Sequence, residues 1–236
     1  MGYTYAMADI HGERTRFHKA LETIKFSDDD ELYIIGDVID RGRDFGLRLL
    51  LEVSKMPNVH LISGNHECMA LRCLSFLMKE ITNASIEGID ENVIRELFEW
   101  QNVGGQVTID EFHHMPYDEQ LEVLEYLGEL PLYAEVTSGG KDYILVHAGL
   151  DNFDEQRPLD SYTPAEVMGF YNVDFSRTYF KNKSIVTGHL PTRCMYDNPR
   201  PDKIFKMNNN IAIDCGCSIG GNLGVLRLGD EEEFYV

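Results

Sequence analysis

Short apolar runs alternate with amphipathic segments over the amino-terminal third of the chain. The runs are rich in β-branched and aromatic residues, which predicts buried strands. Each run is followed by a segment whose apolar residues recur at helical spacing. The predicted strands lie at 3–8, 33–35 and 61–63, and the predicted helices at 14–25, 45–53 and 69–77. This alternation of strand and helix predicts parallel pairing of the three strands.

Polar side chains that can bind metal or phosphate follow each of these predicted strands directly. Loops at the carboxyl ends of parallel strands meet at one edge of a sheet, where open α/β sheets build their binding sites. We therefore expect three loops to contribute to one shared site. Its residues are Asp9, His11, Asp37, Asp40, Arg41, Asn65 and His66.

The rest of the chain divides into a polar helical stretch and a second set of strands. Residues 78–130 form the helical insert, with one predicted helix at 91–101 and another that begins at Pro116, because Pro suits the first helical position. Two later strands, 142–146 and 184–187, run up to His147 and to Gly188–His189. Short strands around 203–207, 211–214 and 223–228 are expected to form an antiparallel tail on the second sheet.

Composition and charge restrict the class of protein. A chain of 236 residues is long enough for one domain, 1–236, with its own core. No apolar run approaches the roughly 20 residues that span a bilayer, and no signal pattern opens the sequence. We expect a cytoplasmic monomer without a membrane partner. Five cysteines without a C-x-x-C pair indicate reduced thiols. The net charge of −19 argues against a nucleic-acid partner.

Five motifs occur in order between residues 9 and 189. They are Asp-x-His-Gly from Asp9, Gly-Asp-x-x-Asp-Arg-Gly from Gly36, Gly-Asn-His-Glu from Gly64, His-Ala-Gly from His147, and Gly-His from Gly188. With these motifs the chain resembles the calcineurin-like metallophosphoesterases, and within them the PPP-type serine/threonine phosphoprotein phosphatases of bacteria and phages. The resemblance covers nearly the whole chain. It implies an α/β fold in which a two-sheet β-sandwich is flanked by helices and carries a helical insert.

The resemblance also implies a site for two divalent metal ions. Two cations roughly 3.5–4 Å apart repel each other, so a carboxylate must bridge them, and we expect Asp37 in this place. The expected ligands are Asp9, His11 and Asp37 for the first ion, and Asn65, His147 and His189 for the second. Mixed imidazole and oxygen ligands favour Mn, Fe or Zn over Ca, and Mn is the first expectation. A water between two such ions loses a proton easily, and we expect it to be the nucleophile.

The alkoxide that leaves a phosphate ester needs a proton. His66 adjoins the expected ligand Asn65, and Asp40 lies three residues after Asp37. A carboxylate partner raises the pKa of a histidine, which makes His66 the expected general acid and Asp40 the residue that orients it. The planar guanidinium of Arg41 suits phosphate oxygens.

One phosphate contact of the resembled family is missing. Relatives place a Trp-x-Arg where this chain has Asn172 at the Arg position. Arg177, five residues on, is the candidate replacement, with Arg41 and Asn65 as the other expected phosphate ligands. Family members also carry a Trp and a Gly-Gly pair in a helical insert, matched here by Trp100 and by Gly104–Gly105. We expect this segment to cap one side of the site.

The leading interpretation is a dinuclear-metal-dependent phosphomonoesterase that removes phosphate from phosphoserine or phosphothreonine. A metal-bound hydroxide is expected to attack the phosphorus. The expected partner is a phosphoprotein or a small phosphorylated substrate. The alternative is a symmetrical dinucleoside tetraphosphate hydrolase, a group that often has Asn in place of Asp40. A nuclease is disfavoured, because Pro191 stands where those branches carry a second His. A metal-binding pseudoenzyme is supported only by the missing Arg.

Overall fold

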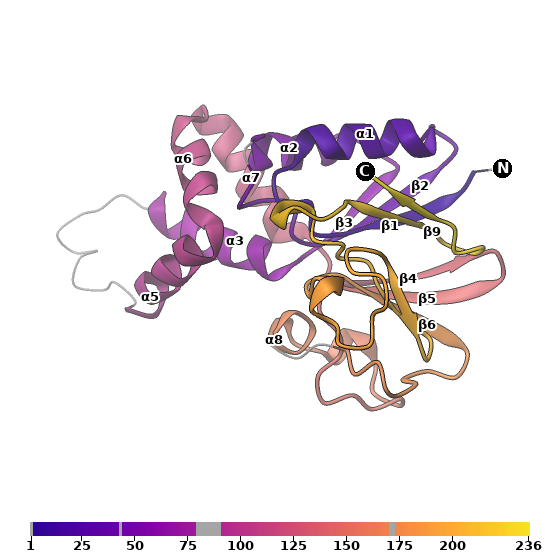
Figure 1. The fold of residues 1–236 in the computed structure, drawn as a ribbon. Helices are drawn as coiled ribbons and strands as arrows, with labels where there is room; N and C mark the ends of the chain where they lie inside the picture. The colour runs from indigo at the N-terminus through magenta and orange to yellow at the C-terminus, as the bar shows by residue number, and fades with distance from the viewer. Residues whose placement is uncertain (1, 43, 79–90, 170–172) are drawn as a thin grey trace.

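The computed structural model describes residues 2–42, 44–78, 91–169 and 173–236. Within them the chain forms two five-stranded β-sheets that pack face to face, with helices on both outer sides (Figure 1). This arrangement confirms the predicted α/β sandwich flanked by helices.

The first sheet contains the three predicted amino-terminal strands. Its order is β10-β9-β1-β2-β3. The pairs β1–β2 and β2–β3 are parallel, as predicted, whereas β9 is antiparallel to β1 and β10 to β9. The prediction that 223–228 joins the second sheet is wrong, since β9 covers the edge of β1 that would otherwise stay unpaired. The strands are β1 (Thr4–Met7), β2 (Glu31–Ile35), β3 (Val59–Ile62), β9 (Gly224–Arg227) and β10 (Glu233–Tyr235).

The second sheet has the order β4-β5-β6-β8-β7. Its three inner strands are parallel, and β4 and β7 are antiparallel edge strands. The predicted antiparallel tail is therefore confirmed for the pair β7–β8 and wrong for the attachment of β8 to β6, which is parallel. The strands are β4 (Tyr133–Ser138), β5 (Lys141–Val146), β6 (Lys183–Thr187), β7 (Phe205–Met207) and β8 (Asn210–Ala212).

Apolar residues on both faces of the sheets build the core. In β1, Tyr5 and Met7 pack toward the helices, while Ala6 and the following Ala8 pack between the two sheets. This alternation follows from the period of two in a strand. Because both faces of β1 are buried, the strand reads as a continuous apolar run rather than as an alternating one.

Helices cover the outer faces of the sandwich. Helices α1 (Arg14–Ile24) and α2 (Gly46–Val53) lie over the first sheet, and α8 (Pro164–Met168) lies below the second (Figure 1). Helix α3 (Asn65–Leu77) begins four residues before its predicted start, so Asn65 and His66 form its first turn rather than a loop. Short 3₁₀ turns within the described residues are η2 (Leu159–Ser161), η3 (Thr192–Cys194) and η4 (Cys217–Ile219).

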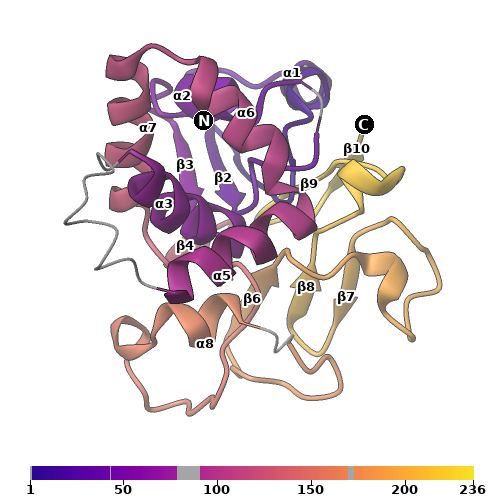
Figure 2. The same ribbon diagram turned by 90° about the vertical axis from the view of Figure 1, so that its left-hand side faces the viewer.

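The insert stands at the end of the sandwich where strands β1–β3 finish (Figure 2). Its described part has three helices where two were predicted, because the chain continues through a kinked turn, η1 (Gln101–Gly105), into α6 (Gln106–His114). The others are α5 (Glu91–Trp100) and α7 (Tyr117–Glu129), which begins one residue after Pro116. Residues 79–90 of the insert lie outside the described residues. None of the described helices is both long and apolar enough to span a bilayer.

Candidate functional site

The first two loops of the site adopt unusual backbone conformations. Asp9, His11, Asp37, Asp40 and Arg41 all have positive φ angles, between 49° and 70°, a region that non-glycine residues rarely occupy. Backbone hydrogen bonds join the two loops, including the amide of His11 to the carbonyl of Asp37 at 2.9 Å. Such strain concentrates at functional sites and persists only where neighbouring structure enforces it.

Glu67 enforces the conformation of the second and third loops. Its buried carboxylate accepts hydrogen bonds from the amides of Asp37, Val38 and Gly64, at 2.7, 2.8 and 3.0 Å. Glu67 thus ties the amino end of α3 to the loop after β2. The resulting geometry places the side chain of Asp37 beside the first turn of α3.

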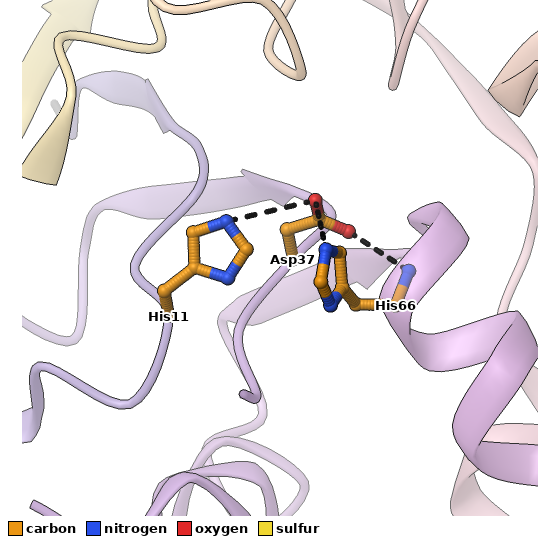
Figure 3. Close-up of side chains that lie close together, drawn as sticks. All are labelled: His11, Asp37 and His66. Atoms are coloured by element: carbon orange, nitrogen blue, oxygen red, sulfur yellow. Dashed lines mark hydrogen bonds and ion pairs between the residues drawn. The ribbon is translucent and has the colours of Figure 1, made fainter. Parts of the chain in front are cut away.

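Asp37 lies at the centre of the predicted metal ligands. Its Oδ2 is 3.8 Å from Nε2 of His11, 3.9 Å from Nε2 of His66 and 3.4 Å from Nε2 of His147. Figure 3 shows the imidazoles of His11 and His66 facing this carboxylate, whose Oδ1 also accepts the amide of His66. Asn65 Oδ1 lies 2.9 Å from His147 Nε2 and 3.0 Å from His189 Nδ1.

These donors fit two metal ions that share one carboxylate. The ligand atoms of His11, Asp37 and His66 lie within 4.8 Å of one another, and so do those of Asp37, His147 and His189. Bound divalent ions would supply charge neutralisation for the phosphate and an activated water. Asp37 belongs to both groups, which agrees with the bridging position predicted for it.

Burial and neighbouring charges strongly shift the pKa values of the histidines in the site. Burial lowers the pKa of His11 to about 3 and that of His189 to about 4, so both imidazoles are neutral and free to bind a cation near pH 7. Burial also acts to lower the pKa of His147, but the charge of Asp37 outweighs it and raises that pKa to about 10. A metal ion bound between these groups would therefore displace a proton from His147.

Asp9 lies at the edge of this cluster. Both of its carboxylate oxygens accept the backbone amide of His189, at 3.1 and 2.9 Å, and burial raises its pKa well above the usual value. Asp9 belongs to neither group of close donors found among the described residues. Its place as a ligand of the first ion stays a prediction.

The predicted pair of His66 and Asp40 is present. Nδ1 of His66 lies 2.5 Å from Oδ2 of Asp40, and both side chains are buried. Burial acts to lower the pKa of His66, but Asp37 and Asp40 together raise it. His66 also lies in the first group of possible metal ligands. The geometry therefore suits a general acid, and the role itself stays a prediction.

Arg41 reaches the same centre. Its two terminal guanidinium nitrogens lie 3.0 Å from Nε2 of His11 and 3.0 Å from Nε2 of His66. A His66 protonated on both nitrogens cannot accept a hydrogen bond from Arg41. Protonation of His66 would thus free one terminal nitrogen of the guanidinium for an anionic ligand such as a phosphate group.

The structure does not bring Arg177 into the site. Its guanidinium carbon lies 4.6 Å from the ring centroid of Tyr179 and 5.4 Å from that of Phe153, an arrangement typical of cation–π contacts. Over the described ranges, no side-chain hydrogen bond or ion pair joins Arg177 to the residues of the site. Asn172, which takes the position of the missing family Arg, lies outside the described residues.

Two buried residues near the site were not anticipated. Thr108, on α6, donates its hydroxyl to Oδ1 of Asp40. Asp214 follows β8, its Oδ1 accepts the amide of Gly216 at 2.9 Å, and burial raises its pKa to about 6. Asp214 directly follows the short apolar run 211–213, and this signal could have identified it.

Comparison with known proteins places this geometry in a family. Residues 4–215 match the calcineurin-like phosphoesterase family. A symmetrical bis(5'-nucleosyl)-tetraphosphatase from Methylobacillus flagellatus is 27% identical over 276 aligned residues, which cover 99% of this chain and 94% of that protein. A protein of the same name from Acidovorax sp. (strain JS42) is 27% identical over 147 residues, 62% of this chain and 43% of that protein, so this second match spans less than half of the relative.

Solved structures share the fold at lower sequence identity. A putative diadenosine tetraphosphatase matches with a TM-score of 0.66 and 20% identity, covering 100% of this chain and 93% of that one. A protein serine/threonine phosphatase from Saccharomyces cerevisiae matches with a TM-score of 0.60 and 14% identity, covering 95% and 72%. The family match extends from β1 through β8, leaves out β9 and β10, and includes the five motifs. The chain therefore belongs to the calcineurin-like phosphoesterases, a family of metal-dependent hydrolases.

Proposed function

We propose that the substrate is a dinucleoside tetraphosphate, cleaved symmetrically between its second and third phosphates. The observation that carries this proposal is the near end-to-end match to a relative of that name. It reverses the order of the two interpretations drawn from the motifs. Two metal ions held by Asp37 and the two histidine groups, together with the guanidinium of Arg41, would supply the positive charge that a polyphosphate needs. We propose Mn²⁺ as the bound metal, since the donors combine imidazole with oxygen.

The second candidate is the removal of phosphate from phosphoserine or phosphothreonine. Asp40 favours it, because the residue is present and lies 2.5 Å from His66. A nucleoside diphosphate is a good leaving group and needs little protonation, whereas a serine alkoxide is a poor one and needs a general acid. An intact acid pair is therefore of more use against a phosphate ester than against an anhydride.

The two candidates can be separated in one assay. Metal-stripped protein is reloaded with Mn²⁺ and given either diadenosine tetraphosphate or a phosphoserine peptide, with nucleotide products resolved by chromatography. The first proposal expects faster turnover of the dinucleotide, with ADP as the sole nucleotide product. ATP and AMP in equal amounts would contradict symmetrical cleavage.

Faster turnover of the peptide would replace the first proposal with the second. The control is the Asp37→Asn variant under the same metal concentration, which should be inactive on both substrates because it lacks the carboxylate common to both clusters. Activity in that variant would trace the signal to a contaminating enzyme.

A further inference from the structure

We propose that one segment of the insert, residues 100–108, positions both the acid pair and the phosphate-binding arginine. The segment ends α5, passes through the kinked turn η1 and starts α6. It contacts the loop after β2 at two consecutive residues, Asp40 and Arg41. The inference concerns phosphoester cleavage in general and does not depend on the dinucleotide being the substrate.

Hydrogen bonds from the insert to both carboxylate oxygens fix the orientation of the Asp40 side chain. Trp100 donates its indole Nε1–H to Oδ2 at 2.6 Å, and Thr108 donates its hydroxyl to Oδ1. The same Thr108 hydroxyl accepts the amide of Asp40 at 3.2 Å. Trp100, Thr108 and Asp40 are all buried. The remaining direction at Oδ2 is taken by Nδ1 of His66, so the insert sets the orientation of the acid pair.

The contacts to Arg41 come from the turn between these two residues. The carbonyl of Gly104 accepts the amide of Arg41 at 3.1 Å, and the carbonyl of Val103 accepts its side-chain Nε–H at 3.1 Å. With Nε bound in this way, the two terminal nitrogens of the guanidinium face His11 and His66. The insert thereby aims the guanidinium at the centre of the site.

The backbone of the turn explains how one segment serves both residues. Gly104 has φ of 115°, and a Cβ built there would lie 2.5 Å from Cγ of Arg41. Only glycine allows this close approach without strain. The φ of Gly104 lies outside the helical region, so the chain kinks here between α5 and α6. Here the turn lets Trp100 and Thr108 reach Asp40 while the carbonyls of Val103 and Gly104 reach Arg41.

The first test measures the dependence of rate on the leaving group. Trp100→Phe removes the indole donor but keeps an aromatic ring, and Thr108→Val removes the hydroxyl at nearly constant side-chain volume. The substrates are phenyl phosphate, a poor leaving group, and 2,4-dinitrophenyl phosphate, a good one. We expect kcat to fall by about tenfold or more on phenyl phosphate and by less than about twofold on the dinitrophenyl ester, since only the former needs the general acid.

Two matched variants complete this test. Thr108→Ser retains the hydroxyl and should keep the wild-type profile, and Phe98→Ala alters an exposed residue of the same insert and should also keep it. Equal loss on both esters would mean that Trp100 and Thr108 only support the fold, and no loss on either would mean that they do not position the pair. Both results would overturn the inference.

The second test measures the contact between the insert and Arg41 separately from the acid pair. Gly104→Ala should raise KM and the inhibition constant of inorganic phosphate, by about tenfold, without changing the dependence on the leaving group. In an Arg41→Ala background the same change should add nothing, because residues that act through one contact are not additive. An equal effect of Gly104→Ala with and without Arg41 would contradict the proposed link.

A spectroscopic measurement makes the inference independent of turnover. In metal-free protein, the proton between His66 and Asp40 should give a low-field ¹H NMR signal, assigned by its loss in His66→Asn. Trp100→Phe and Thr108→Val should broaden or shift this signal, and Thr108→Ser should not. An unchanged signal in both variants would overturn the inference. A protein that ignores diadenosine tetraphosphate but shows these effects would refute the proposed substrate alone.

Discussion

Oδ2 of Asp37 lies 3.4 Å from Nε2 of His147, at the junction of the two sheets. The two residues follow β2 and β5, which belong to different sheets. The site is therefore built across the sandwich and not on one sheet edge alone. Both groups of possible metal ligands meet at this one carboxylate.

The number of metal ions bound by variants should show whether both ions share Asp37. Asp37→Asn should weaken the binding of both ions, by about tenfold or more, because a ligand contributes at least as much as the outer contacts that support it. His11→Ala should weaken one ion and His189→Ala the other, since each histidine belongs to only one group. Metal analysis after dialysis, at a fixed Mn²⁺ concentration, measures all three variants. Loss of a single ion in Asp37→Asn would refute the bridging position.

The role of His66 can be separated from metal binding. His66→Asn should lower kcat on a phosphoserine peptide or phenyl phosphate by about 100-fold or more, the usual contribution of a general acid, with both metal ions retained. Asp40→Asn should cause a smaller loss, because it leaves the imidazole in place. Loss of one metal ion in His66→Asn would identify His66 as a ligand, which its position in the first cluster also allows. Unchanged turnover would refute both roles.

The parts of the site that the sequence predicts are local in the chain. A buried strand that stops at Gly or Asp is visible in a few residues, so the loops carrying His11, Asp37, His147 and His189 could be located without coordinates. Thr108 could not, because its contact with Asp40 joins residues 68 positions apart and a Thr in an amphipathic helix carries no signal of its own. The pairing of β9 with β1 could not be predicted either, since it joins distant parts of the chain and depends on which sheet edge is left unpaired.

Glu67 should contribute strongly to stability. Glu67→Gln replaces one accepting oxygen by an amide that faces the backbone N–H groups of Asp37, Val38 or Gly64. We expect the free energy of unfolding of the metal-free protein to fall by about 3 kcal/mol, since buried donors then lack an acceptor. Urea denaturation of this variant, with Glu125→Gln on the exposed face of α7 as control, measures the difference. A similar small change in both would show that the three hydrogen bonds are not needed.

The segment after His147 should lose stability in acid through Glu166. This carboxylate accepts both terminal nitrogens of Arg157 and the amide and hydroxyl of Thr163, and these contacts lower its pKa from 4.5 to about 2. The backbone of Glu166 and Val167 in turn accepts the amides of Asp151 and Ala148, which anchors the loop that leaves His147.

The sign of the effect follows from linkage. A carboxyl with a lowered folded pKa adds stability above its unfolded pKa and loses it as the pH falls through the folded value. The Tm of the wild type should therefore exceed that of Glu166→Gln at pH 7, and this excess should shrink as the pH falls from 4.5 to 2. Thermal unfolding of the metal-free proteins across this range measures it, and Glu155→Gln in the same loop serves as control. A difference that stays constant down to pH 2 would show that the charge of Glu166 does not stabilise this loop.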